Sequence, residues 1–172
     1  MKYESNITLQ AAGQKLRVAK KIVVTTHAKP DGDAFGSVIA LCEVLRRQQT
    51  DVTALFMPPI PDGLTDICGE VAITLFDDDY QLSEADLYVV VDTGAWSQVS
   101  PLREQLEKHM DKTLVIDHHI SGDIDAAFKF IDSKAAACAE IIARFVDELM
   151  AHVFEDKVVS NALYVGIATD TG

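Results

Sequence analysis

The sequence contains a short polar segment whose residues could bind metal ions. A histidine is followed four residues later by one aspartate, and two residues after that by another: His27, Asp31 and Asp33. Pro30 stiffens this turn, and Gly32 permits an unusual backbone angle between the two aspartates. Because clustered carboxylates repel one another, such a group is favourable when cations offset its charge. N-capping of the helix that follows is an alternative interpretation of Asp33, but it leaves the other two residues unexplained.

Two more segments of this kind follow apolar runs. Asp92 opens D-T-G directly after L-Y-V-V-V, and Asp117, His118 and His119 directly follow L-V-I. Carboxylate and neutral imidazole together suit manganese, iron or zinc. Adjacent side chains diverge, so the two histidines are expected to have different roles. An ordinary turn residue, or a pair of surface histidines with no role, is the alternative for each segment.

A fourth candidate, Asp170, lies in G-I-A-T-D-T-G after a helical pattern. A helix C-terminus followed by a turn is the alternative here, although the helix dipole disfavours an aspartate at that position. Taken together, the four segments suit a two-metal centre. Such centres hold two ions about 3.5–4 Å apart and activate a bridging water for attack on phosphorus.

The elements between these segments predict how they are positioned. Short β-rich runs alternate with helical stretches, which indicates an α/β fold with a mainly parallel sheet flanked by helices. Strands are predicted at 21–26, 51–57, 72–76, 87–91, 113–116 and 128–131, the last at an edge. Helices are predicted at 6–20, 34–48, 101–110, 135–150 and 156–168. Sites in open α/β sheets lie beyond the carboxyl ends of the strands, so we expect the polar segments to meet at that rim.

Composition narrows the class of protein. The 172 residues suit one domain, and 48% of them are hydrophobic, as in ordinary globular proteins. The sequence predicts no membrane span and no signal peptide, so a cytoplasmic location is expected. The net charge of −12 argues against binding long duplex nucleic acid. Part of this charge serves solubility, and part is accounted for if several carboxylates bind metal.

Four motifs in order resemble those of the DHH phosphoesterase superfamily. They are H-x-x-P-D-G-D-A-x-G-S (27–37), V-V-V-D-T-G (89–94), V-I-D-H-H (115–119) and G-I-A-T-D-T-G (166–172). The first motif most resembles the bifunctional oligoribonucleases and pAp phosphatases (nano-RNases), whose members act as exonucleases on short RNA. Cyclic-dinucleotide phosphodiesterases have a similar domain, and family II inorganic pyrophosphatases are more distant relatives.

The resemblance implies a role for each matching residue. One metal ion would be held by His27, Asp31 and Asp92, and the other by Asp33, Asp92, His118 and Asp170. Asp92 would bridge the two ions, which are expected to be Mn²⁺, with Mg²⁺ or Co²⁺ as alternatives. His119 would contact the substrate phosphate or protonate the leaving oxygen, and Asp117 would support the histidines from behind.

The sequence departs from the family pattern in two places. Relatives often carry serine and threonine before the helix that follows the D-H-H motif, whereas residues 135–140 here are A-A-A-C-A-E. The family normally continues into a second, substrate-binding domain called DHHA1, with a glycine-rich, basic surface. Residues 1–172 are interpreted as the DHH catalytic domain alone, so weak or absent activity is expected from this chain by itself.

The leading hypothesis is therefore a manganese-dependent hydrolase, a phosphodiesterase or phosphatase. Its expected substrates are oligoribonucleotides, pAp, or linear or cyclic dinucleotides, cleaved by two-metal activation of a bridging water. Inorganic pyrophosphatase activity and a metal-binding regulatory role without turnover stay open as alternatives. No membrane partner is expected, and a homodimer is one of the assemblies left open.

Overall fold

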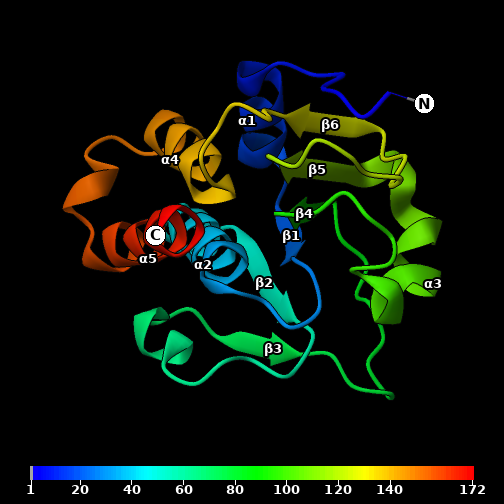
Figure 1. Ribbon diagram of the computed structural model, residues 1–172, viewed down its shortest axis with the longest axis horizontal. Coiled ribbons are helices and arrows are strands. Elements are labelled where there is room, and N and C mark those ends of the chain that lie inside the picture. Colours follow the sequence, from blue (N-terminus) through cyan, green and yellow to red (C-terminus); the bar gives the residue numbers. More distant parts are fainter. Residues whose placement is uncertain (1) are drawn as a thin grey trace.

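The computed structural model describes residues 2–172, which form an α/β fold around one six-stranded sheet (Figure 1). All neighbouring strands run parallel, in the order β3-β2-β1-β4-β5-β6. The strands are β1 (Lys21–Thr25), β2 (Asp51–Phe56), β3 (Ile73–Leu75), β4 (Leu87–Val91), β5 (Thr113–Asp117) and β6 (Phe128–Ile131). The predicted fold class and all six predicted strands are confirmed.

The strand order reverses at the centre of the sheet. From β1 the chain moves outward through β2 to β3, and from β4 it moves outward the other way through β5 to β6. Strands β1 and β4 are hydrogen-bonded neighbours. The loops that leave their carboxyl ends therefore diverge, and this opens the crevice in which ligands of doubly wound sheets bind.

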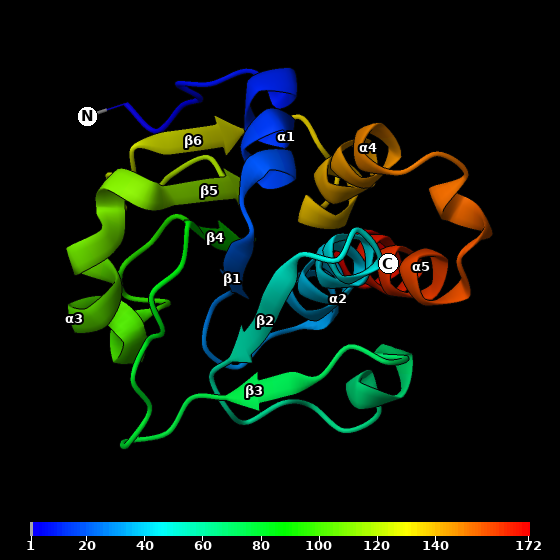
Figure 2. The ribbon, with the colours of Figure 1, turned by 180° about the vertical axis from the view of Figure 1, so that it is seen from behind.

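Four long helices lie on one side of the sheet, where α5 packs on the outer side of α2 and against α4 (Figures 1 and 2). They are α1 (Leu9–Val18), α2 (Gly32–Arg47), α4 (Cys138–Leu149) and α5 (Lys157–Thr171). The opposite face packs against residues 96–110, which include the short helix α3 (Arg103–Leu106). With both faces covered, β4 and β5 are buried along their whole length, as their continuous apolar sequences predict. Within residues 2–172, none of the helices is both long and apolar enough to cross a membrane.

The predicted helix at 101–110 is where the structure differs most from the sequence pattern. It is divided into a 3₁₀ turn η2 (Ser100–Leu102), helix α3 and a second 3₁₀ turn η3 (Glu107–Lys112). His109 leaves helical geometry at φ −127°, and its ring stacks on Tyr88 of β4 with 4.6 Å between centroids. The His109 carbonyl also accepts a 2.8 Å hydrogen bond from the Thr113 hydroxyl. These tertiary contacts outweigh the local helical preference. Two further 3₁₀ turns are η1 (Leu64–Ile67) and η4 (Val153–Glu155).

Helices α2 and α5 approach closely because glycine lies where they meet. A Cβ added to Gly36 of α2 would collide with the carbonyl oxygen of Ala162 in α5. Gly166 of α5 similarly leaves room for Ala139 of α4 and for the carboxylate of Asp33. The close approach brings the first turn of α2, the start of α4 and the end of α5 together beside the carboxyl ends of the strands.

Candidate metal centre

The loop after β1 places His27 and Asp31 at the rim of the sheet. Lys29 adopts a left-handed backbone with φ 55°, which makes the loop turn sharply. Asp31 then caps α2, since its Oδ1 accepts a 3.0 Å hydrogen bond from the Ala34 N–H. The alternative interpretation of Asp33 as the cap is wrong. Helix α2 begins two residues earlier than predicted, so Asp33 lies within its first turn and is buried.

Asp92 lies at the centre of the site, directly after β4. Its N–H still joins the sheet by a 3.0 Å bond to the Ile116 carbonyl, while its backbone is left-handed with φ 59°. Strain of this kind in a non-glycine residue is typical of functional sites. The side chain is only 3% exposed, and its Oδ1 has no hydrogen-bond partner. Among residues 2–172, the only other buried side-chain oxygen without a partner is Thr25 Oγ1.

The D-H-H segment at the end of β5 directs its three side chains differently. His118 points its Nε2 at Asp92, while its Nδ1 lies 3.4 Å from the Ala135 carbonyl. His119 is half exposed, and its Nδ1 lies 2.7 Å from Oδ1 of Asp117. Asp117 is fully buried, and its Oδ1 also accepts the backbone N–H groups of both histidines. The expected difference in role between the histidines agrees with this geometry.

Asp33 and Asp170 come from helices that pack against each other. Asp33 accepts hydrogen bonds from the backbone N–H groups of Cys138 and Ala139, at 2.6 and 2.7 Å. Asp170 was expected beyond the end of a helix at 168, but α5 continues to Thr171 and carries Asp170 in its last turn. There its carboxylate lies 3.8 Å from Nε2 of His118.

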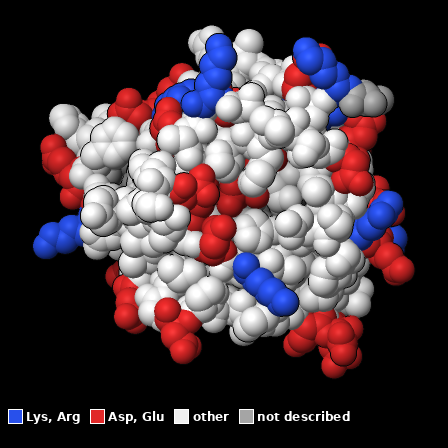
Figure 3. All heavy atoms as spheres, in the orientation of Figure 1, with Lys and Arg blue, Asp and Glu red and all other residues white. Residues whose placement is uncertain are grey.

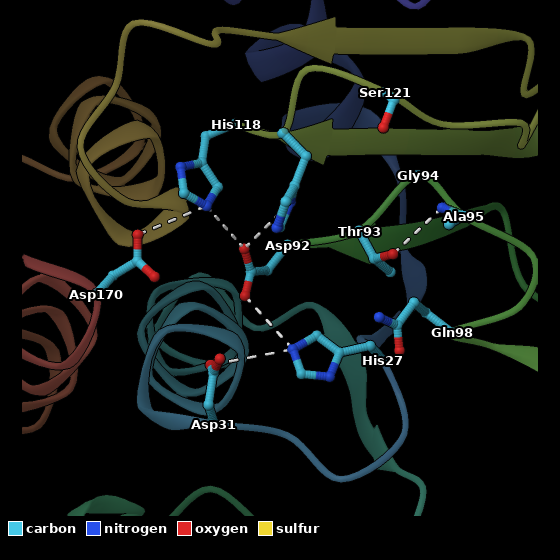
Figure 4. A pocket seen from close by; sticks show the side chains of 11 residues that line it. His27, Asp31, Asp92, Thr93, Gly94, Ala95, Gln98, His118, Ser121 and Asp170 are labelled. Atoms are coloured by element: carbon cyan, nitrogen blue, oxygen red, sulfur yellow. Dashed lines mark hydrogen bonds and ion pairs between the residues drawn. The ribbon is translucent and has the colours of Figure 1, made fainter.

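Five of the six predicted metal ligands line one pocket, shown in Figure 4, and the sixth, Asp33, lies with its Oδ2 3.8 Å from Nε2 of His118. His27 Nε2 lies 3.6 Å from Asp92 Oδ2 and 3.9 Å from Asp31 Oδ1. His118 Nε2 lies 3.4 Å from Asp92 Oδ1. Three groups bring one potential ligand atom of each member within 4.8 Å of the others. They are His27–Asp31–Asp92, Asp33–His118–Asp170 and Asp92–His118–His119.

These residues fit divalent cations. Most of the distances between the histidine Nε2 atoms and the carboxylate oxygens are longer than a hydrogen bond. They match the separation of roughly 3–4 Å between two ligands that each lie about 2.1 Å from the same ion. The unpartnered Oδ1 of Asp92 is an acceptor that a cation would satisfy. The Nδ1 atoms of His27 and His118 lie beside backbone carbonyls, at 3.0 and 3.4 Å. That placement leaves each Nε2 free to bind metal.

Without metal, the clustered charges shift several pKa values. Burial, reinforced by the charge of Asp92, raises the pKa of Asp33 to about 7. Contact with Asp92 raises the pKa of His118 to about 9, against the opposing effect of burial. Burial opposes ionisation of Asp92, yet the surrounding histidines hold its pKa below the ordinary value. The metal-free site therefore retains protons that bound cations would displace.

The metal-free protein is expected to lose stability as the pH rises from about 4 to about 9. Asp33 stabilises the fold fully below 3.8, and this contribution is lost as the pH rises through about 7. His118 contributes fully below 6.5 and loses its contribution as the pH rises through about 9. Urea melts in the presence of a chelator should give a lower midpoint at pH 8.5 than at pH 5.5. A midpoint that rises over this interval would contradict the expectation.

The pocket has a volume of about 310 Å³ and is lined by more than metal-binding residues. Thr93, Gln98 and Ser121 add polar groups opposite the acidic side (Figure 4). Acidic side chains gather near the middle of the face seen in Figure 3, and Asp31, Asp92 and Asp170 line the pocket. Gln98 and Ser121 were not predicted as site residues, although Ser121 follows the D-H-H motif by two residues.

Comparison with known proteins agrees with the motifs. The sequence model of the DHH family, N-terminal domain, matches residues 21–167. A probable bifunctional oligoribonuclease and PAP phosphatase NrnA of Streptococcus mutans is 30% identical over 161 residues, covering 92% of this chain and 48% of that protein. The cyclic-di-AMP phosphodiesterase GdpP of Geobacillus thermodenitrificans is 25% identical over 186 aligned positions, covering 97% of this chain and 27% of that protein.

A solved structure has the same fold. An exopolyphosphatase-related protein from Bacteroides fragilis superposes with a TM-score of 0.82 and 26% identity, over 95% of this chain and 50% of the other.

The NrnA of Bacillus subtilis is 26% identical to this chain over 152 residues, and the match covers 46% of its length. The chain thus spans about half the length of the curated NrnA relatives it matches.

Proposed function

Because this chain belongs to the DHH family of phosphoesterases and contains its N-terminal domain, we propose that it is the catalytic domain of an enzyme that hydrolyses short nucleotides. The proposed substrates are oligoribonucleotides, pAp, or linear or cyclic dinucleotides, in keeping with the names of its relatives. One observation carries the proposal: six motif residues from separate loops and helices gather around the buried Asp92 carboxylate, and five of them line one pocket.

The proposed cofactor is a pair of divalent cations, manganese first, with magnesium or cobalt as alternatives. His27, Asp31 and Asp92 would hold one ion, and Asp92 with Asp33, His118 and Asp170 would hold the other. The two separate ligand groups on either side of Asp92 support this division. When bound, such a pair supplies an activated water nucleophile and offsets the negative charge that develops on the phosphate.

Other residues of the pocket are proposed to act on the substrate itself. The Nδ1–H of His119 donates to Asp117, so its Nε2 is available to contact a phosphate oxygen or to protonate the leaving oxygen. Thr93, Gln98 and Ser121 supply neutral donors on the opposite wall. Neutral donors suit phosphate oxygens in a site whose acidic side is reserved for cations.

The size and charge of the site support short substrates. A pocket of about 310 Å³ has room for a terminal phosphate and part of a nucleotide, and a net charge of −12 repels long polyanions. We propose that a DHHA1 domain supplies the basic half of the binding cleft, as suggested by relatives about twice as long. A cytoplasmic location and a homodimer stay predictions.

Hydrolysis of a defined panel would test the proposal. The panel contains bis-p-nitrophenyl phosphate, pApA, pAp and pyrophosphate, each with manganese and with a chelator. We expect manganese-dependent cleavage of the two nucleotides, with higher kcat/KM once the DHHA1 domain is present. Preferential cleavage of pyrophosphate would favour the pyrophosphatase alternative. Stoichiometric manganese binding without turnover of any substrate, with or without that domain, would favour a regulatory role.

A further inference from the structure

The segment before α1 lies along the exposed edge of the sheet, beside β6 (Figure 1). The Ser5 hydroxyl donates to the Ile131 carbonyl at 2.9 Å and accepts the Ile131 N–H at 2.7 Å. Asn6 pairs with Lys129 through its N–H at 2.9 Å and through its side-chain oxygen at 2.7 Å. These bonds satisfy groups of an edge strand that would otherwise face solvent. Tyr3 lies two residues before Ser5, at the start of this segment.

Tyr3 is inserted between two loops of the candidate site. Its ring lies against Gly94, which follows β4, and against Gly122, which follows β5. A Cβ added to either glycine would collide with this ring, so both positions need glycine while Tyr3 is in place. At the end of the ring, the hydroxyl donates a 2.6 Å hydrogen bond to Oδ2 of Asp117. Burial and the charge of Asp117 raise the pKa of Tyr3 far above its ordinary value, so the hydroxyl stays a donor.

Asp117 in turn holds His119. Its Oδ1 accepts the Nδ1–H of His119 at 2.7 Å and the backbone N–H of His118 at 2.8 Å. Its Oδ2 is held by Tyr3. A carboxylate fixed at both oxygens cannot rotate, and it therefore sets the direction of the imidazole bonded to it. The His119 side chain is 52% exposed, and its ring otherwise packs edge-on against the ring of His118, with 4.6 Å between centroids.

We propose that Tyr3 is a positioning residue for phosphate-ester hydrolysis, acting through Asp117 to aim Nε2 of His119 into the pocket. The inference rests on the proposed function, because it assumes that His119 meets the substrate. Tyr3 lies outside residues 21–167, which match the family, and contacts no predicted metal ligand through its hydroxyl. Its hydroxyl touches neither the pocket nor the reacting atoms, so its effect on rate passes through the imidazole.

The hydrogen-bond chain can be tested without any turnover. Nitrogen NMR of the histidine rings, in the metal-free protein, would compare wild type with Tyr3→Phe and with Ser5→Ala. The first variant removes only the hydroxyl, and the second disturbs the edge pairing but leaves Asp117 untouched. The His119 signal, identified by its loss in His119→Gln, should move in Tyr3→Phe alone, with that of His27 unchanged. No movement in Tyr3→Phe, or equal movement in both variants, would overturn the inference.

A kinetic cycle then tests the consequence for catalysis. With the manganese-loaded protein and bis-p-nitrophenyl phosphate, Tyr3→Phe should lower kcat by about tenfold and leave KM and metal content nearly unchanged. In a His119→Gln background the same substitution should have no further effect, because its route is already removed. A structural role would instead lower the rate by the same factor in both backgrounds. If wild type cleaves no phosphate ester even with the DHHA1 domain present, the proposed function fails, and the NMR comparison still decides whether Tyr3 positions His119.

Discussion

Replacing Asp92 with asparagine is expected to lower manganese-dependent hydrolysis by about a thousandfold or more, or roughly 4 kcal/mol of transition-state stabilisation. The two oxygens of Asp92 face different histidines, with Oδ2 3.6 Å from His27 and Oδ1 3.4 Å from His118. No other carboxylate among the described residues is shared by two of the ligand groups. The loss of the Asp92 carboxylate should therefore weaken the binding of both predicted ions. Metal content per chain and kcat/KM would measure this loss.

Asparagine makes this test clean because it tolerates the left-handed backbone that Asp92 adopts at φ 59°. The surrounding histidines hold the Asp92 pKa below its ordinary value, so its charge stabilises the metal-free fold, and the metal-free variant should melt at the same temperature as wild type or lower. Asp78→Asn is the matched control, since it makes the same chemical change at an exposed position away from the pocket. Full metal content together with a wild-type rate in Asp92→Asn would contradict a bridging role.

Much of this site could be predicted because parallel strands end at a common rim. The apolar runs at 87–91 and 113–116 and the segment at 21–26 are too short and too β-rich for helices, and each leads into a polar loop. Once the fold is α/β, these loops have to converge. The structure accordingly brings His27, Asp92 and His118 together, although they are far apart in sequence.

Features that depend on contacts between helices could not be predicted in the same way. The local pattern predicted that α5 ends at 168. In the structure α5 packs closely on α2 at Gly36 and continues through Asp170. Asp33 was the candidate N-cap from the sequence. Only the three-dimensional position of α4 shows that its carboxylate instead accepts hydrogen bonds from the start of that helix. Tyr3 carries no motif at all, because its relation to Asp117 spans 114 positions of the sequence.

Asp33 contacts both the metal site and the start of α4, and its replacement is expected to have the second large effect. Helix α4 begins after Ala137, which offers no side-chain cap, in the segment A-A-A-C-A-E. Asp33 of α2 takes over this role by accepting the N–H groups of Cys138 and Ala139. It is 1% exposed, so neither N–H group would find water if the carboxylate were removed. Asp33 therefore joins α2 to α4 as well as facing the metal site.

Asp33→Ala is expected to destabilise the metal-free protein by roughly 2–6 kcal/mol, because two buried donors each lose a partner at about 1–3 kcal/mol. Its matched control is Asp170→Ala, which removes a carboxylate from the same ligand group but at an exposed position. Both variants should lose bound manganese, whereas only Asp33→Ala should unfold at lower urea. Melts at pH 6 are the sharpest comparison, because repulsion between Asp33 and Asp92 is weak below the Asp33 pKa of about 7. Equal melts for the two variants would mean that Asp33 serves the metal site alone and that α4 needs no cap from α2.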